Sequence, residues 1–316
     1  MAHISPEDSR RICYSVLNDM QKSIFEENKE IDFSFEVKGV ARFRANYYFH
    51  KNSVAGVFRK VPVEIPDFSK LGLPEHLTEL TKKPNGLILI TGPTGSGKTT
   101  TIASLLDIIN QQYYGHIVTL EDPIEYMHSH GKCMVSQREI GSDSNSYSKA
   151  LKSVVRQDPD YCLIGELRDL ESIETALLLA ETGHLVFATL HTNSCVQTIS
   201  RVVSVFPSEQ QDRVRKILSF ALQGIVSQKL LPSQLSGRVV AYEVMLFNAG
   251  VRNLVRENKL HQLESMMQLG QSTTGMNTLN QSLFQLVSEG HISRELAETN
   301  SLDQDNLNKM FEKAGV

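Results

Sequence analysis

A glycine-rich loop at residues 92–99 constrains this chain more than any other stretch. It reads Gly-Pro-Thr-Gly-Ser-Gly-Lys-Thr and fits the pattern G-x-x-x-x-G-K-[ST] at every fixed position. The preceding run, residues 87–91, is short and β-rich, as a buried parallel strand is. Apolar residues then recur at helical spacing, and Gly115 supplies a stop. Strand, loop and helix in this order predict a phosphate-binding turn.

The residue types in this loop suit a nucleoside triphosphate. Backbone N–H groups at a helix N-terminus attract anions, and glycines leave room for phosphates to approach them. Lys98 can reach the β- and γ-phosphates, and the Thr99 hydroxyl can ligate Mg²⁺. We therefore expect ATP and Mg²⁺ to bind here, the alternative being a glycine-rich turn with a chance lysine. The candidate nucleotide-binding residues of this stretch are Gly92, Pro93, Thr94, Gly95, Ser96, Gly97, Lys98, Thr99 and Thr100.

Composition narrows the class of protein. The chain has 316 residues, is 41% hydrophobic and carries a net charge of −4, with no long basic run, so nothing in its charge indicates nucleic acid as the main partner. The isolated cysteines Cys13, Cys133, Cys162 and Cys195 form no C-x-x-C pair and suit a reducing cytoplasm. No apolar run approaches the ~20 residues of a membrane span. We expect a soluble protein that could still dock on a membrane complex.

The residues before the loop predict a separate small domain. Residues 7–30 have a helical apolar stripe, and residues 32–37, 41–47 and 54–59 alternate as antiparallel strands do, with turns at Lys38-Gly39 and Lys51-Asn52. Proline and glycine then interrupt the pattern. We therefore predict an α+β domain at residues 1–63, a linker at 64–73 and a larger α/β domain at 74–316.

Arginines lie on the predicted strands of the small domain. Arg42, Arg44 and Arg59 could simply form a solvated sheet face, or they could contact phosphate charge on a neighbouring molecule. An arginine supplied by a neighbour can accelerate phosphoryl transfer by ~10³–10⁵. Because the loop contains no arginine, Arg44 and Arg59 are candidates for that role.

Strand and helix patterns alternate after the loop. Residues 117–120, 161–164 and 185–190 predict strands, and residues 171–181 predict a helix. This order indicates a parallel sheet with helices on both faces, which binds ligands beyond the carboxyl ends of its strands. From Pro207 the pattern is helical, with an apolar stripe from Val214 to Ile225 and further helices within residues 250–290. Residues 300–316 are polar, and we expect them to be peripheral.

Acidic and imidazole side chains follow the predicted strands. Glu166 could order the attacking water, directly or as a Mg²⁺ ligand beside Thr99, or it could cap the next helix. Of Glu121 and Glu125, one could hold a metal-bound water while the other caps a turn, and the sequence does not say which. His191 is best interpreted as a γ-phosphate sensor or a proton-path group.

A second histidine stands at the other end of the same predicted strand. His184 and His191 are therefore too far apart to share a metal ion. We include His184 among the candidate nucleotide-binding residues, and a structural role in a turn is the alternative.

Several segments together resemble the type II/IV secretion ATPases. Residues 119–125 resemble the acidic box of that superfamily, residues 156–169 its atypical Walker B segment, and residues 180–193 its histidine box. Residues 250–257 are similar to the A-I-R-N-L-I-R-E element of its pilus retraction branch, with Gly250, Val251 and Val255 as mild departures. Residues 41–59 are similar to the PAS-like N-terminal domain of that branch, which usually begins with a further strand–helix segment, so we expect a partial PAS-like domain.

The resemblance implies a fold and an activity. It implies a RecA-like P-loop ATPase domain preceded by the PAS-like unit, and a cytoplasmic homohexamer with ATP at its subunit junctions. It further implies a motor at the inner face of the bacterial inner membrane, which depolymerises type IV pili through a PilC-like platform protein and so drives twitching motility. By the same resemblance, Glu166 is the catalytic glutamate, and Arg44 and Arg59 reach the ATP.

Other functions remain open at this point. A pilus-assembly or type II secretion ATPase of the same superfamily usually carries a tetracysteine zinc element and a larger N-terminal region, and neither appears in these residues. A nucleic-acid translocase on the same core would show DNA-stimulated hydrolysis. A regulatory nucleotide-binding module would not turn ATP over.

Overall fold

The computed structural model describes residues 3–37, 39–62 and 64–315, with the side chains of residues 270–273 left out. Lys38, in a predicted turn, and Val63, at the predicted end of the first domain, lie outside the described residues. The chain divides into two compact units, one of residues 1–65 with 123–127 and one of residues 66–122 with 128–316. Each unit is described by itself.

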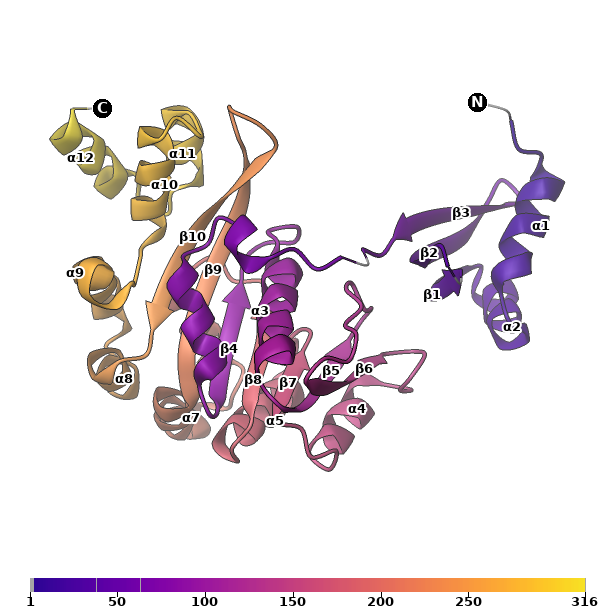
Figure 1. Cartoon of the computed structure of the whole chain (residues 1–316), viewed down its shortest axis with the longest axis horizontal. Coiled ribbons are helices and arrows are strands. Elements are labelled where there is room, and N and C mark those ends of the chain that lie inside the picture. Colours follow the sequence, from indigo (N-terminus) through magenta and orange to yellow (C-terminus); the bar gives the residue numbers. More distant parts are fainter. Residues whose placement is uncertain (1–2, 38, 63, 316) are drawn as a thin grey trace. The chain divides into compact units, whose positions relative to one another are not determined.

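The N-terminal unit holds an antiparallel sheet in the order β1-β2-β3 with two helices (Figure 1). The single helix predicted over residues 7–30 is wrong, because Asn18 and Gln21 form a capping box that begins a second helix. The elements are α1 (Pro6–Val16), α2 (Asp19–Asn28), β1 (Glu30–Val37), β2 (Ala41–His50) and β3 (Ser53–Lys60).

The two faces of this small sheet differ in chemistry. One face carries aromatic side chains and forms a core around Phe25 and Tyr47, both fully buried. Side chains alternate across a strand, so Arg42 and Arg44 lie on the other face. Arg59 on β3 is the direct cross-strand partner of Arg44, and both side chains are exposed. Two of the predicted arginines are thus adjacent on one exposed face of this unit.

The predicted linker at residues 64–73 is too long. Residues from Pro66 onward belong to the second unit, where Phe68 and Leu73 are buried against the strand that precedes the glycine loop. Two short 3₁₀ helices, η1 (Phe68–Lys70) and η2 (Glu75–Lys82), occupy this part of the chain. The apolar residues between the prolines therefore serve the core of the larger unit.

A mostly parallel sheet forms the centre of the second unit and confirms the predicted α/β class. Within the described residues it has seven strands in the order β10-β9-β4-β8-β7-β5-β6. Among these described strands, β9 and β10 form the one antiparallel pair. The strands are β4 (Gly86–Thr91), β5 (Gly115–Glu121), β6 (Cys133–Glu139), β7 (Tyr161–Ile164), β8 (Leu185–Leu190), β9 (Leu222–Pro232) and β10 (Arg238–Leu246).

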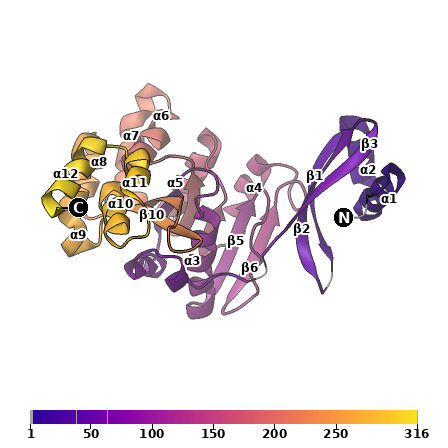
Figure 2. The same ribbon diagram turned by 90° about the horizontal axis from the view of Figure 1, so that it is seen from above.

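Helices cover both faces of this sheet, as Figures 1 and 2 show. Ile88 and Ile90 of β4 pack toward α3 on one face, and Leu87 and Leu89 pack toward α5 and α7 on the other. This separation follows from the alternation of side chains along a buried strand. The helices are α3 (Lys98–Gln112), α4 (Tyr147–Val154), α5 (Leu170–Glu181), α6 (Cys195–Ser204) and α7 (Ser208–Ala221).

The C-terminal part departs from its prediction. The helix after Pro207 ends at Ala221, and Ile225 lies inside β9 instead of continuing the helical stripe. Helices then gather beside β9 and β10 (Figure 1). Leu307 and Phe311 are fully buried there, so the prediction of a peripheral C-terminus is also wrong. These elements are α8 (Ala249–Arg256), η3 (Leu260–Gln262), α9 (Leu263–Thr274), α10 (Leu279–Ser288), α11 (Arg294–Asn300) and α12 (Gln304–Ala314).

Within the residues that the structure describes, no helix combines the length and the apolarity that a membrane crossing requires.

Candidate nucleotide site

The glycine loop leaves β4 and enters α3, as the motif predicts. Gly92, Gly95 and Gly97 have φ values of 137°, 80° and 90°, a region that residues with side chains rarely adopt. A Cβ on Gly92 would lie 2.1 Å from the carbonyl oxygen of Gln228 on β9. The loop can therefore keep this path only with glycine at that position.

The first turn of α3 is open to an anion. Gly97 occupies the N-cap position, and no side-chain cap bond is made to this turn in the described structure. The first N–H groups of a helix lack intrahelical partners, and the helix dipole favours negative charge beside them. The Lys98 ammonium lies over the loop and donates to the carbonyl oxygens of Gly92 at 2.8 Å and of Pro93 at 3.0 Å. Loop, helix end and lysine form one phosphate-binding cradle.

The parallel register brings other candidate residues to the same edge of the sheet. Thr91 at the end of β4 pairs with Leu190 at the end of β8, and β7 pairs with β8 and with β5. His191 follows β8, Glu166 follows β7, and Glu121 ends β5. All three therefore lie at the carboxyl edge where the glycine loop begins, as predicted.

Glu166 lies between two cationic or potentially cationic side chains. Its carboxylate accepts from Arg168 Nε at 2.7 Å and lies 3.3 Å from His191 Nε2. The hydrogen bond to Glu166 raises the pKa of Arg168. Arg168 also pairs with Asp122 at 3.3 Å, so it joins the ends of β7 and β5. Glu166 and His191 thus form a pair. The alternative interpretation of Glu166, as only a helix cap, is wrong because the Asp169 side chain caps α5.

Three residues of this cluster were not predicted. Arg168 and Asp122 stand inside motifs that the sequence shows, but their charges pair only once the strands are placed. The Tyr147 hydroxyl accepts from the backbone N–H of Glu166 at 3.2 Å, and burial raises its pKa to about 12. A tyrosine at the start of a separate helix gives no signal in the sequence that links it to Glu166.

Glu121 reaches the predicted edge but is buried there. It is 6% exposed and accepts from the Thr119 hydroxyl at 2.6 Å and from Gln137 Nε2 at 3.2 Å. These neighbours hold the carboxylate between β5 and β6. Glu125 is exposed and belongs with residues 123–127 to the N-terminal unit, as Arg44 and Arg59 do. The roles of Glu125, Arg44 and Arg59 stay predictions.

The placement of His184 requires a correction. It precedes β8, and Leu185 pairs with Gly86 at the start of β4, so His184 lies at the opposite edge from the glycine loop of its own chain. Its Nδ1 lies 3.0 Å from the carbonyl oxygen of Leu179 and 3.1 Å from the Thr182 hydroxyl. These contacts fit the alternative role in the turn after α5. A nucleotide-binding role for His184 in its own subunit is therefore wrong.

Comparison with known proteins agrees with this geometry. A family model described as type II/IV secretion system protein matches residues 48–301. The chain belongs to this family. The type IV pilus retraction ATPase PilT of Pseudomonas aeruginosa is 48% identical over 94% of this chain and 86% of its own length. A twitching motility protein of Neisseria gonorrhoeae is 42% identical over 97% of this chain and 82% of its own length.

Solved structures place the secretion-family fold along nearly the whole chain. A crystal structure of the pilus retraction motor PilT with bound ADP superposes with a TM-score of 0.93 at 52% identity, covering 98% of this chain and 88% of that one. The family model and these relatives cover the glycine loop, the Glu166 segment and the histidine segment together. The nucleotide-binding interpretation of the carboxyl edge therefore agrees with the family.

Proposed function

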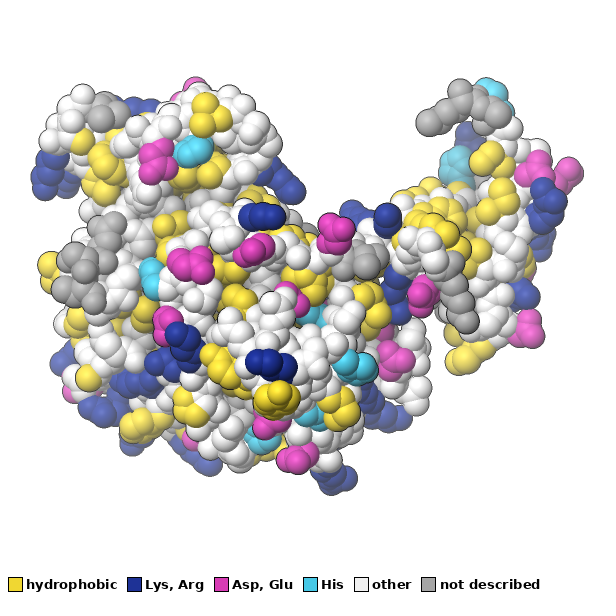
Figure 3. Space-filling view, in the orientation of Figure 1, with side chains coloured by type: hydrophobic (Ala, Val, Ile, Leu, Met, Phe, Trp, Pro, Cys, Tyr) yellow, Lys and Arg dark blue, Asp and Glu magenta, His cyan; other side chains and the backbone are white. Residues whose placement is uncertain are grey.

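We propose that this protein is an ATP-hydrolysing motor that drives retraction of type IV pili. The observation that carries the proposal is the meeting of the phosphate cradle with the Glu166–His191 pair at one sheet edge. The relatives named for pilus retraction and twitching motility, which cover nearly the whole chain, support the choice of motor over other secretion ATPases. Acidic and basic side chains are interspersed on the face seen in Figure 3, which gives no support to a nucleic-acid translocase.

The donor groups at the site fit a magnesium nucleotide. Thr99 offers a hydroxyl and Glu166 a carboxylate, which are oxygen ligands of the kind that Mg²⁺ prefers. Among the described residues, no cluster of three His, Cys, Asp or Glu side chains could hold a metal ion alone. This suits Mg²⁺, which usually keeps waters and phosphate oxygens as ligands. When bound, the ion would neutralise phosphate charge beside Thr99.

Different residues of the chain have different roles in the proposed hydrolysis. The N–H groups of the loop and Lys98 bind and orient the phosphates. Glu166 orients the attacking water and accepts its proton, a role for which a carboxylate beside the terminal phosphate is suited. In the described structure Arg168 donates a hydrogen bond to Glu166. When ATP binds, the attacking water replaces Arg168 as the partner of Glu166, and Glu166 can then orient that water. His191, beside Glu166, senses the γ-phosphate.

Assembly completes the proposed site. The motor is a cytoplasmic homohexamer at the inner face of the bacterial inner membrane, where it acts on a PilC-like platform protein. Arg44 and Arg59, adjacent and exposed on one sheet face, are supplied to the ATP of a neighbouring subunit. Glu125 joins the site as the second acidic residue. An arginine from a neighbour stabilises the charge that develops on the transferred phosphoryl group.

The direct test of the function is a deletion strain of the source bacterium. Loss of a retraction motor leaves cells hyperpiliated and without twitching motility, and the wild-type gene restores both properties. Complementation with Glu166→Gln should leave the cells hyperpiliated. Bald cells would contradict retraction and indicate an assembly ATPase instead.

The trans role of the arginines has its own test. Arg59→Ala should lower ATP turnover of the assembled protein by about 10²-fold or more, because the neighbouring charge is lost. Lys60→Ala, the next residue of β3 on the opposite side of the strand, is the matched control. Hexamers mixed from Arg59→Ala and Glu166→Gln subunits should recover part of the activity, since some junctions then contain both native groups. No recovery in mixed hexamers would contradict a role in trans.

A further inference from the structure

Two adjacent residue pairs of the β9–β10 ladder contribute side chains that contact the two loops of the nucleotide site. Glu243 on β10 pairs with Ser227 on β9, and the next pair is Tyr242 with Gln228. Successive side chains of a strand point to opposite faces of the sheet. Gln228 therefore reaches the face covered by α3, and Glu243, one pair along on the partner strand, reaches the face covered by α6. The side chains of Gln228 and Glu243, from two adjacent residue pairs, therefore lie on opposite faces of the sheet.

Gln228 of β9 contacts the phosphate-binding loop through its side chain and its backbone. It is 2% exposed, its Nε2 donates to the carbonyl oxygen of Ser96 at 2.7 Å, and its Oε1 accepts from the Thr101 hydroxyl at 3.0 Å. Its own carbonyl oxygen is the atom that a Cβ on Gly92 would meet at 2.1 Å. One residue of β9 therefore touches the beginning of the loop, its middle and the first turn of α3. A buried amide with both ends satisfied fixes these segments in one arrangement.

Glu243 holds the start of α6, which follows the histidine loop. It is 6% exposed, and its Oε1 accepts from the backbone N–H of Cys195, the first residue of α6, at 3.0 Å. The Cys195 thiol contacts the carbonyl oxygen of Ile225 on β9 at 3.4 Å. The histidine loop, residues 191–194, is therefore fixed by β8 at one end and by this contact at the other. His191 is four residues from the fixed point.

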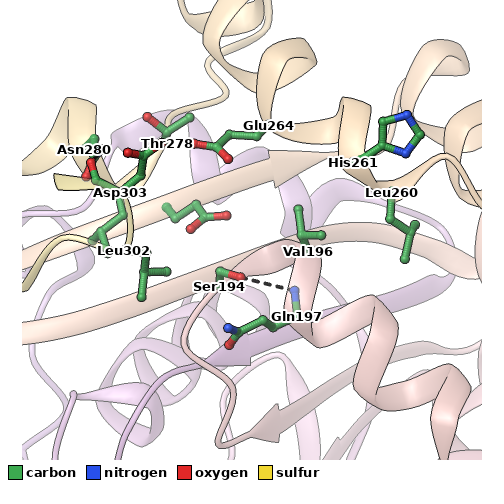
Figure 4. A pocket seen from close by; sticks show the side chains of 12 residues that line it. Ser194, Val196, Gln197, Leu260, His261, Glu264, Thr278, Asn280, Leu302 and Asp303 are labelled. Carbon is green, nitrogen blue, oxygen red and sulfur yellow. Dashed lines mark hydrogen bonds between the residues drawn. The ribbon is translucent and has the colours of Figure 1, made fainter. Parts of the chain in front are cut away.

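A pocket lies beside the contact between Glu243 and Cys195. This pocket of about 260 Å³ with a mixed polar and apolar lining opens between the first turn of α6 and the C-terminal helices, and Ser194, Glu243 and Asp303 are among its lining residues (Figure 4). In the close-up, Ser194 accepts from the backbone N–H of Gln197 at 3.1 Å and so closes the cap of α6 within the loop itself. Cys195 is fully buried in the core beside β9, so packing and the bond to Glu243 together fix the start of α6.

We propose that Gln228 and Glu243 are positioning residues, one for the phosphate loop and one for the histidine loop, and that the β9–β10 pair sets the two loops relative to each other. The proposal rests on the proposed ATP hydrolysis. It predicts that substitutions of Gln228 and of Glu243 affect different kinetic quantities. Gln228 acts on nucleotide affinity, because its loop binds phosphates, whereas Glu243 acts on turnover, because its loop carries the γ-phosphate sensor.

The first test replaces one hydrogen-bond donor. Gln228→Glu keeps an oxygen for Thr101 but loses the donor to Ser96, and it should weaken ADP binding at least tenfold by titration calorimetry. The matched control is Gln223→Glu on the same strand, whose side chain contacts Asn85 and Arg252 at the opposite edge of the sheet, and ADP affinity should stay within twofold. Thr101→Val removes only the second bond of Gln228 and should give a smaller loss. Unchanged ADP affinity in a folded Gln228→Glu protein would overturn the role of Gln228.

The second test separates turnover from binding. Glu243→Ala should lower kcat about tenfold while KM for ATP and the Kd for ADP stay within twofold, and Glu243→Gln, whose amide oxygen can still accept from Cys195, should restore most of kcat. Glu264→Gln, on another wall of the same pocket, should leave kcat unchanged. If Glu243→Ala does not fold, Glu243→Asp, which is too short to reach Cys195, replaces it. Equal losses in kcat and affinity, or no loss, would overturn this prediction.

Measurements on the wild-type protein distinguish failure of the proposed function from failure of the positioning proposal. If it binds no ADP and hydrolyses no ATP, the proposed function itself fails. If it does both and the Gln228 and Glu243 variants behave like wild type, the function stands and the positioning proposal fails.

Discussion

The two ends of β8 carry the same side chain in different surroundings. His191 follows the strand and lies 3.3 Å from the Glu166 carboxylate, among residues that line up with the glycine loop. His184 precedes the strand and contacts the carbonyl oxygen of Leu179 and the hydroxyl of Thr182, within the turn after α5. It also lines a polar pocket of about 360 Å³ with Lys82, Lys83 and Asp160.

The position of a side chain at the amino or carboxyl end of a parallel strand therefore decides whether it lies near the nucleotide site. Both edges of the sheet hold lysine, carboxylate and histidine, so residue type does not separate them. The carboxyl edge alone receives the glycine loop and the open end of α3, because chain direction brings βα loops there. Pairs of matched substitutions at the two edges test this conclusion.

The largest effect is expected for the lysines. Lys98→Ala should reduce nucleotide affinity by about 10²-fold or more and abolish measurable turnover, since charge-assisted bonds to phosphate contribute about 1.5–3 kcal/mol each. Lys82→Ala, in the pocket of the opposite edge, should leave both quantities within twofold. Fluorescent-nucleotide titration and phosphate release measure them. Comparable losses from the two substitutions would break the distinction between the edges.

A smaller loss, confined to turnover, is expected for the carboxylates. Glu166→Gln should still bind ATP but hydrolyse it about 10²–10⁴-fold more slowly, because the amide cannot accept the proton of water. Glu181→Gln, at the end of α5 near His184, is the control and should hydrolyse ATP normally. Turnover at the wild-type rate in Glu166→Gln would show that this carboxylate does not position the water.

The smallest effect is expected for the histidines, which are the same residue type at the two ends of β8. His191→Ala should lower kcat about tenfold, equivalent to roughly 1.4 kcal/mol in the barrier, since it removes one contact beside the terminal phosphate. His184→Ala should leave kcat unchanged and lower the melting temperature slightly, because its hydrogen bonds close a turn. A kcat defect in His184→Ala that exceeds that of His191→Ala would contradict the assignment.

Much of this edge could be predicted because its signals are local. The glycine loop, the short apolar strands and the acidic or histidine residues after them stand together in the sequence, and parallel topology then fixes which edge they share. The β9 strand could not be predicted in the same way. The apolar periodicity of α7 continues past Ala221 to Ile225, so the pattern alone did not show where the helix ends. Because β9 was not predicted, Gln228, which lies in that strand, was not predicted as a residue of the site either.

Other errors have equally specific causes. The early end of the linker depends on Phe68 and Leu73, whose burial follows from packing that local composition does not reveal. His184 belongs to a recognisable motif, but a motif spans both ends of β8 and does not say which end faces the ligand. The pairing of Arg168 with Asp122 joins residues far apart in the chain and needs the sheet order.

A structure of the assembled protein with a non-hydrolysable ATP analogue and Mg²⁺ tests directly whether the nucleotide binds at the carboxyl edge of the sheet. In that structure the triphosphate should lie against the backbone of residues 92–99, with Glu166 and His191 beside the terminal phosphoryl group and His184 remote from the nucleotide of its own subunit. A nucleotide at the opposite edge of the sheet, or Glu166 and His191 turned away from the terminal phosphate, would contradict this placement.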